Sequence, residues 1–342
     1  DEIAAVDLSK ECACIGISSG EYYPGRLYTP ADFAKGDISQ GSADDMSATF
    51  RIVLPLEKNI TYGLSGETAT YAQQIYINGK LLNEVGTVSD NADAFIPAAD
   101  RYTLYFTPQT DTTEILIRHA WFNHRSGTIQ KLSLAEAPVI TANDRAQMIC
   151  DGLITGTLLA MAIFFFGMFM LGNGRYSMLW FSLSCFSAAL HYLIYESKQI
   201  RVLLPYLDWY IGHKLEYITN ISYFVFILLF AFSVLGIRPH RWFVTASVCT
   251  VGSVVLFYII APSYVYSYFT VPLGAVFMAY FIFAAAYTCV ITIKQKLIRY
   301  ADSVIVCLTV GVTGAVYIVE SLTYFTRVLY LRSYATILFV FC

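Results

Sequence analysis

The sequence predicts two unlike parts, an all-β sandwich of jelly-roll type followed by an all-α bundle of transmembrane helices. The first observation is composition: of 342 residues, 56% are hydrophobic and only 14% are charged, whereas soluble domains carry about 25% charged residues. The second is charge asymmetry. Residues 1–147 hold 19 acidic and 11 basic side chains, a formal charge of −8, and residues 148–342 hold 6 acidic and 11 basic ones, a formal charge of +5. We therefore expect a water-facing domain joined to a membrane domain near residue 147.

The front part, residues 20–140, reads as short strands with no long helical period. Residues 49–54 and 113–118 are rich in β-branched and apolar side chains, which is typical of strands. The clearest signal is a hairpin, in which residues 71–77 and 80–85 flank Asn78-Gly79. Asn-Gly favours a type I′ turn, because both central residues of that turn need a positive φ. Prolines punctuate the remainder, so an antiparallel sandwich of jelly-roll type is expected.

The back part contains long apolar segments. A helix needs roughly 20 mostly apolar residues to cross a bilayer core about 30 Å thick. Six segments reach that length: 148–171, 176–197, 215–236, 242–261, 269–293 and 303–325. A seventh begins near Tyr334 and stops at Cys342, so we expect seven spans with the chain cut inside the last. Six spans with a short apolar tail is the alternative. Short connectors predict that neighbouring helices run antiparallel.

Several other features limit the function classes. No basic stripe is present, so a nucleic-acid partner is not expected. The pair Cys12 and Cys14 lacks the second pair that a zinc ribbon needs, and we expect no metal, no cofactor and no disulfide framework. Lys and Arg are almost equally divided between the loops on the two sides of the membrane, so their distribution does not indicate an orientation.

The sequence resembles the bacterial seven-transmembrane receptors with diverse intracellular signalling modules across nearly its whole length. The segments that carry the resemblance are, in order, 21–33, 62–64, 75–80, 86–88, 106–108, 113–115 and 123–127, followed by the hydrophobic segments. The resemblance implies a galactose-binding-like jelly-roll sensor outside the cytoplasm (21–140) and a seven-helix domain of the cell membrane (141–342). It also implies a sensor that binds carbohydrates or related small molecules. The N-terminal segment (1–20) lies outside the segments that carry the resemblance.

In this family a cytoplasmic output module, such as a histidine kinase, a diguanylate cyclase or a phosphatase, usually follows the seventh helix. The present sequence ends within that helix. No catalytic motif is found in it, such as His-Glu-x-x-His or Gly-x-Ser-x-Gly. We therefore expect that the region shown is not an enzyme.

Two groups of side chains are candidates for the sensor site. A sugar site needs an aromatic plate and planar hydrogen-bonding groups, which Trp121, Asn123, His124 and Arg125 supply. The alternative is that the aromatic residues fill the core while the polar ones shape a turn. The second group comprises the three neighbouring tyrosines Tyr22, Tyr23 and Tyr28, which either line a groove or cover a sheet face.

Acidic residues suggest one more site. Asp90, Asp93 and Asp100 lie in what reads as a polar loop and could offer oxygen ligands to calcium. Their spacing does not fit an EF-hand loop, so a solvated loop is the preferred interpretation.

Ionisable groups near the outer ends of the spans are candidates for a relay between the sensor and the helices. Such groups are costly in a membrane and face the bundle interior, a cavity or a partner. The hypothesis is a polar, Tyr-lined cavity, and the alternative is snorkelling at the level of the lipid headgroups. The candidates are Asp151, His191, Glu196, His213, Glu216 and Glu320, of which His191 and Glu320 lie deepest.

The preferred function is a signal-transduction receptor, and the alternatives are a transporter with an accessory binding domain and a membrane-anchored adhesion protein. We expect the lipid bilayer and a small-molecule or carbohydrate ligand as partners, with a homodimer left open. The strands end near Leu134 and the first span starts about a dozen residues later, so the predicted linker is short. The chain beyond Cys342 would discriminate these functions, because an output domain there would support the receptor.

Overall fold

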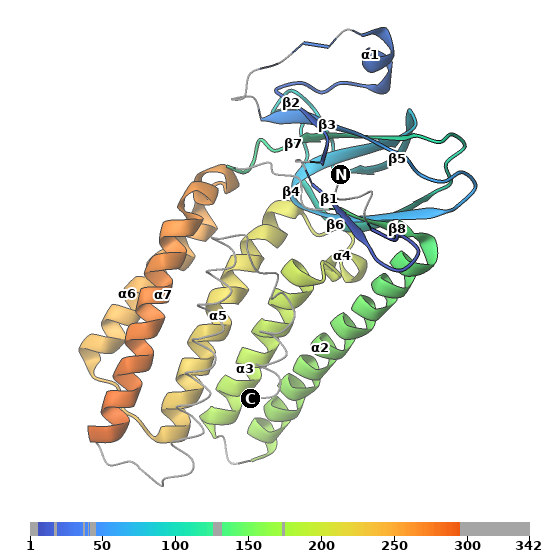
Figure 1. Cartoon of the computed structure of the whole chain (residues 1–342). Coiled ribbons are helices and arrows are strands. Elements are labelled where there is room, and N and C mark those ends of the chain that lie inside the picture. Colours follow the sequence, from blue (N-terminus) through green and yellow to red (C-terminus); the bar gives the residue numbers. More distant parts are fainter. Residues whose placement is uncertain are drawn as a thin grey trace. The chain divides into compact units, whose positions relative to one another are not determined.

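The computed structural model describes residues 6–16, 19–36, 38–39, 41, 46–125, 132–172 and 175–294. The chain divides into two compact units, Asp1–Ile149 and Cys150–Cys342, which are described separately (Figure 1). The predicted sixth span and the truncated seventh lie outside the described residues.

The first unit is an antiparallel β-domain, as predicted. Its strands are β1 (Ala13–Ile15), β2 (Glu21–Pro24), β3 (Ser47–Leu54), β4 (Tyr62–Ile77), β5 (Lys80–Val85), β6 (Ala98–Phe106), β7 (Thr113–Ala120) and β8 (Leu132–Glu136). They form one curled sheet in the order β1-β8-β4-β7-β3-β2, with β5 and β6 also paired to β4. One short helix, α1 (Pro30–Lys35), begins where the Asp32 carboxylate accepts a hydrogen bond from the Thr29 N–H at 2.7 Å.

Strand β4 is the centre of this sheet (Figure 1). Its first half pairs with β6 and β8, and its second half pairs with β5 and β7. The register shifts between Thr68 and Tyr71, at the point where β4 passes from one set of partners to the other. A bulge of this kind bends a strand and increases its twist, which explains how one strand serves both halves of a half-barrel.

The predicted hairpin is confirmed. Residue Ile77 pairs with Lys80, and the two residues between them have positive φ, 48° at Asn78 and 79° at Gly79. The Asn78 side chain also accepts a hydrogen bond from the Glu114 N–H at 2.8 Å. The turn is therefore tied to the neighbouring strand β7 as well as to its own hairpin.

The core of the β-domain lies on the inner face of the curled sheet. Alternate residues of each strand point to the same face, and the inward ones are almost all apolar. They include Phe50, Leu64, Ile75, Ile115, Ile117, Leu132 and Leu134, each no more than 1% exposed.

The linker predicted after the last strand is helical instead. Strand β8 ends at Glu136, and helix α2 (Ala137–Leu171) begins at the next residue. Pro138 is compatible with this helix start, because the N–H groups of the first helical turn form no hydrogen bonds within the helix. Helix α2 is thus 35 residues long, which is longer than the predicted span 148–171.

The second unit is helical, with α3 (Tyr176–His191), a π-helical turn η3 (Tyr192–Glu196), α4 (Ile200–Leu203), α5 (Trp209–Leu235), α6 (Arg241–Ile260) and α7 (Ser263–Lys294). Within the described residues, five helices, one of them α2, are long and apolar enough to cross a membrane. Helix α3 packs most extensively against α5. Helices α5 and α7 begin earlier than the predicted spans at residues 215 and 269. In α5 the reason is Asp208, whose carboxylate caps the N–H groups of Tyr210 and Ile211.

Candidate functional site

A group of aromatic and polar side chains lies at one end of the inner face of the β-domain. We call it the His119 cluster, and it consists of Tyr22, Tyr71, Gln73, His119 and Trp121. His119 is paired in register with Gln73 on one side, and it is fully buried. Its ring stacks on Trp121 with 5.0 Å between centroids, and the rings of Tyr22 and Tyr71 lie at 6.0 and 6.2 Å.

The hydrogen bonding of Gln73 makes this cluster polar. Its side-chain oxygen accepts a hydrogen bond from the Tyr102 hydroxyl at 2.8 Å. Its side-chain nitrogen is buried and has no hydrogen-bond partner within the described part of the chain. Burial raises the pKa of Tyr22, and it raises the pKa of Tyr102 well above its usual value of 10. Both phenols therefore stay neutral hydrogen-bonding groups at physiological pH.

The predicted sensor residues 121–125 follow β7 directly. The Trp121 N–H donates to the Met46 carbonyl at 2.9 Å, which holds the indole beside His119. The next residues form a turn, in which the His124 N–H donates to the Trp121 carbonyl at 3.0 Å. Asn123 and His124 are half-buried and Arg125 is exposed. The structure thus places Trp121 in the His119 cluster and the three polar residues in the turn after it.

The predicted tyrosines separate onto two faces of the sheet. Neighbouring residues of a strand point to opposite faces, so Tyr22 faces His119 while Tyr23 faces away. Tyr23 instead packs with Tyr28 and Phe33, at centroid distances of 5.8 and 5.4 Å. The three tyrosines therefore do not form one group.

Charged residues surround this second aromatic group. The Arg51 guanidinium lies 4.9 Å from the centre of the Phe33 ring. It also forms ion pairs with Glu114 at 2.6 Å and with Glu21 at 3.0 Å. The Tyr23 hydroxyl donates to Glu21, and this bond together with Arg51 lowers the pKa of the Glu21 carboxyl below its usual 4.5. Each of these groups already takes part in an ion pair, a hydrogen bond or a ring contact, so we interpret the arrangement as one that stabilises the surface of the sheet.

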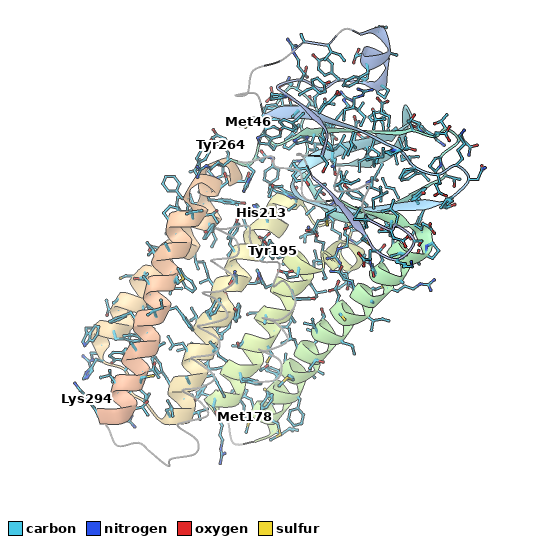
Figure 2. The ribbon with its side chains drawn as sticks, viewed as in Figure 1. Met46, Met178, Tyr195, His213, Tyr264 and Lys294 are labelled. Atoms are coloured by element: carbon cyan, nitrogen blue, oxygen red, sulfur yellow. The ribbon has the colours of Figure 1, made fainter. Side chains whose placement is uncertain are left out.

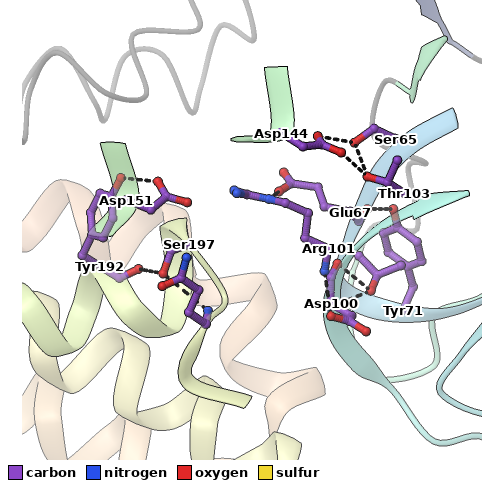
Figure 3. Close-up of polar contacts among 12 residues, drawn as sticks. Ser65, Glu67, Tyr71, Asp100, Arg101, Thr103, Asp144, Asp151, Tyr192 and Ser197 are labelled. Carbon is purple, nitrogen blue, oxygen red and sulfur yellow. Dashed lines mark hydrogen bonds and ion pairs between the residues drawn. The ribbon is translucent and has the colours of Figure 1, made fainter. Parts of the chain in front are cut away.

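The first turns of α2 are bound to the outer face of the sheet by side chains (Figure 3). The Asp144 carboxylate accepts hydrogen bonds from Thr103 at 2.6 Å and from Ser65 at 3.5 Å. One turn earlier, Ile140 is 1% exposed. A Cβ atom added to Gly63 would lie 2.9 Å from the Ile140 Cβ, so the helix rests directly on the backbone of β4.

Further polar contacts lie on β4 and β6 near the bulge (Figure 3). The Tyr71 hydroxyl donates to the Glu67 carbonyl at 3.0 Å, and the Glu67 carboxylate lies 4.0 Å from the Arg101 guanidinium. Tyr71 also belongs to the His119 cluster. One strand, β4, therefore carries residues of that cluster, the bulge and the contact with α2.

In the helical unit, the predicted relay residue Asp151 has a clear partner. The buried Asp151 carboxylate accepts a hydrogen bond from the Tyr192 hydroxyl at 2.7 Å (Figure 3). This bond joins α2 to the π-helical turn after α3. Glu196 lies at the end of that turn, and Glu320 lies outside the described residues.

His191, His213 and Glu216 are brought together between α3 and α5. His191 Nδ1 lies 3.1 Å from the Glu216 carbonyl oxygen, and His213 Nδ1 lies 3.1 Å from the Glu216 carboxylate. Because α5 begins with the cap at Asp208, all of these groups fall near that end of the helix, where Figure 2 labels His213. Three of the relay candidates, His191, His213 and Glu216, are thus neighbours in the structure.

Aromatic rings surround His213, and sequence analysis did not single them out. Its imidazole stacks on Trp209 at 4.8 Å and meets Tyr217 and Tyr266 at 5.2 and 5.5 Å. Tyr217 stacks in turn on Tyr258 at 4.5 Å. These residues come from α5, α6 and α7, so only the packed structure brings them together.

Metal binding finds no support in the described ranges, where no group of three or more His, Cys, Asp or Glu side chains could hold an ion. Asp100 lies within β6 and not in the loop that holds Asp90 and Asp93. Its carboxylate accepts a hydrogen bond from the Arg101 N–H at 2.9 Å. The arrangement expected for a calcium loop is therefore not formed by these three residues.

Tyr71, Gln73 and His119 are the residues of the β-domain cluster that sequence reasoning missed. A signal was present, because Ile115, Ile117 and His119 alternate, as do Gln73, Ile75 and Ile77. Extending both patterns by one step would have placed a histidine and a glutamine at inward positions of adjacent strands. The register that pairs them is not encoded in either strand alone.

Comparisons with known proteins bear on both units. No curated protein matches the chain. Among solved structures, a PA14 sugar-binding domain from an RTX adhesin is similar at 16% identity and a TM-score of 0.21, covering 37% of this chain and 71% of that one. A family model described as 7TM diverse intracellular signalling matches residues 147–342. The matched region is the one that contains the apolar helices, and the chain therefore belongs to the 7TM diverse intracellular signalling family.

Proposed function

We propose that this chain is the input part of a signalling receptor in the cell membrane. Its β-domain lies outside the cytoplasm and binds a small molecule of carbohydrate-like chemistry, and its helices pass the signal to a cytoplasmic output module. The region itself carries out no chemical step. The observation that carries the proposal is the contact of Asp144 with Thr103 and Ser65, by which the sheet holds the first turns of α2.

The contact with α2 supports a relay because no flexible segment separates the sheet from the helix. A tether of many residues would dissipate a movement of the sheet, whereas here α2 starts one residue after β8. A ligand can shift the equilibrium between two conformations only by the difference in its affinity for them. Binding near β4 can create such a difference, because β4 also forms part of the surface on which α2 rests.

The side chains of the His119 cluster support a ligand with hydroxyl groups and an apolar face. Trp121 and Tyr22 are half-exposed aromatic rings, which suit the apolar face of a sugar ring. Gln73 lies behind them, and its buried side-chain nitrogen is a planar donor without a hydrogen-bond partner among the described residues. Asn123, whose side chain is another planar amide, lies in the turn that directly follows Trp121.

The ligand is tested with the full chain in lipid nanodiscs and a panel of monosaccharides, read out by hydrogen–deuterium exchange. A binding sugar should slow exchange at the end of β7 and alter it in residues 137–149. Trp121→Ala should abolish both effects. Tyr76→Ala is the matched control and should retain them, because Tyr76 is an aromatic residue on the opposite face of β4.

Three outcomes decide between the parts of this proposal. If no sugar changes exchange in either segment, the carbohydrate ligand is rejected. If a compound of different chemistry changes both segments, the receptor function stands with another ligand. A compound that changes β7 but leaves residues 137–149 unaffected contradicts the relay through α2.

The orientation is tested in intact cells with a membrane-impermeant maleimide. Cys14 is exposed on the β-domain, so the reagent should label it when that domain lies outside the cytoplasm. Cys14→Ser is the control that identifies the labelled site. Labelling of Cys14 only after the cells are permeabilised would reverse the orientation.

A further inference from the structure

The helical unit contains two buried polar atoms on rings that contact each other from two different helices. They are Nε2 of His213 on α5 and the hydroxyl of Tyr266 on α7, and neither has a partner within the described part of the chain. The His213 side chain is 6% exposed, and Tyr266 is fully buried. A buried polar group without a hydrogen bond is strongly destabilising, so two such groups on neighbouring rings require an explanation.

The surroundings of the two atoms are aromatic. The rings of His213 and Tyr266 are 5.5 Å apart, and Tyr266 also meets Tyr217 and Tyr258 at 5.6 Å each. Tyr217 and Tyr258 carry hydroxyls, but neither hydroxyl is a hydrogen-bond partner of the two atoms. The partner that His213 and Tyr266 lack is therefore not supplied by the ring walls.

The hydrogen bond of His213 with Glu216 fixes what the missing partner must do. A carboxylate only accepts hydrogen bonds, so Nδ1, which lies 3.1 Å from the Glu216 carboxylate, is the donor. In the neutral imidazole Nε2 is then an acceptor, and in the imidazolium it is a second donor. A phenol hydroxyl can both donate and accept. A partner that serves both atoms must therefore be able to donate and accept as well.

We propose that a water molecule occupies this position and bridges His213 Nε2 to the Tyr266 hydroxyl. Buried waters characteristically bind two to four polar groups that would otherwise be unsatisfied. This water forms a polar link between α5 and α7. Through Glu216, whose carbonyl contacts His191, the link extends to α3, so three helices share one hydrogen-bonded site.

The water is detected directly by radiolytic hydroxyl-radical labelling of the full chain in detergent, with mass spectrometry of each tyrosine. Radicals formed from a bound water oxidise the side chain beside it even when bulk solvent has no access. Tyr266 should be labelled several-fold faster than Tyr192. Tyr192 is the matched control because it is 4% exposed and its hydroxyl is bonded directly to Asp151 at 2.7 Å.

Thermal unfolding of variants gives an independent test. Tyr266→Phe removes one end of the bridge and should lower the melting temperature by about 3 °C. His213→Asn keeps a donor for Glu216 but removes the atom at the position of Nε2, and its effect should not add to that of Tyr266→Phe. Tyr264→Phe is the control and should be neutral, because the Tyr264 hydroxyl is exposed and bonds only its neighbour Tyr268.

The proposal is overturned by either of two results. One is a labelling rate at Tyr266 that is no higher than at Tyr192. The other is a Tyr266→Phe variant at least as stable as the parent chain, since deleting a hydroxyl that truly lacks a partner removes a penalty and no bond.

Discussion

The Thr103 hydroxyl on β6 donates a hydrogen bond to the Asp144 carboxylate on α2 at 2.6 Å. These residues are far apart in sequence, and their bond fixes the first turns of the helix on the sheet. Hydrogen bonds to charged groups contribute about 1.5–3 kcal/mol. Asp144→Ala should therefore lower the free energy of unfolding of the β-domain by roughly this amount, measured by urea denaturation of the full chain in detergent.

The same variant should speed hydrogen exchange in residues 137–149, and a control separates this from a general charge effect. Asp93→Ala removes an exposed carboxylate of the same domain and should change neither quantity. An Asp144→Ala chain with unaltered exchange in these residues would mean that the bond does not hold the helix.

Gly63 provides a steric test of the same contact. A methyl group at this position would lie 2.9 Å from the Ile140 Cβ, so the helix or the strand must shift. Gly63→Ala should cost about 1–3 kcal/mol of stability, and Ile140→Ala in the same chain should recover part of the loss. Gly152→Ala is the control within α2. It has nothing within 4 Å of the added atom, and it should stabilise the helix by about 1 kcal/mol.

The stability of the surface around Glu21 should depend on pH. The hydrogen bond from Tyr23, followed by that from Arg51, lowers the pKa of Glu21 below 4.5. Because the folded pKa is the lower one, the stabilisation is complete above about pH 4.5 and is lost as the pH falls through the folded value. Glu21 is 58% exposed, so solvent screening keeps the effect small.

The measurement for Glu21 compares the parent chain with Glu21→Gln across about pH 2 to 7, a range that reaches at least about two units on each side of the ordinary glutamate pKa. The difference in unfolding free energy should be present at neutral pH and vanish at the acidic end. Tyr23→Phe should shift the transition to higher pH. A difference that grows on acidification would contradict the assigned partners.

The bond between Tyr192 and Asp151 should contribute measurably to the helical unit. Both groups are buried, and the distance between their oxygens is 2.7 Å. Tyr192→Phe and Asp151→Asn should each lower stability by about 0.5–1.5 kcal/mol. Asp151→Asn keeps an acceptor oxygen at this position, so the double variant combines Tyr192→Phe with Asp151→Leu, and because these two changes remove the two ends of one bond their effects should not add. Strict additivity in thermal unfolding would show that the two groups act independently.

The sequence predicted those features that depend on local patterns. Asn78-Gly79 identified the hairpin because positive φ at two successive residues is rare outside such a turn. Apolar length identified the five long helices of the described residues, although α2, α5 and α7 begin earlier than predicted. His213 and Lys214 are polar but belong to α5, since the cap at Asp208 and not hydropathy determines where that helix begins. The segment after Leu134 was predicted to be a short linker, yet it is helical from Ala137, and Pro138 is compatible with a first helical turn.

The composition of the sites depended on register and packing, which a single sequence does not reveal. Tyr22 and Tyr23 are adjacent in the chain but point to opposite faces, and only the pairing of β2 with β3 decides which one faces His119. Tyr266 meets His213 because α5 and α7 pack side by side, and no spacing in the sequence indicates this contact. The residues 121–125 were chosen for their chemistry, and the structure places only the first of them in the His119 cluster.

Strand β4 also has a consequence for how the β-domain unfolds. Its first half has strand neighbours on both sides, and so does its second half. Amide protons there can exchange with solvent only when one of these neighbours has separated. Neither half of the sheet can detach while keeping its own centre intact, so the domain should lose its structure in a single cooperative step, with the amides of β4 as the last to exchange.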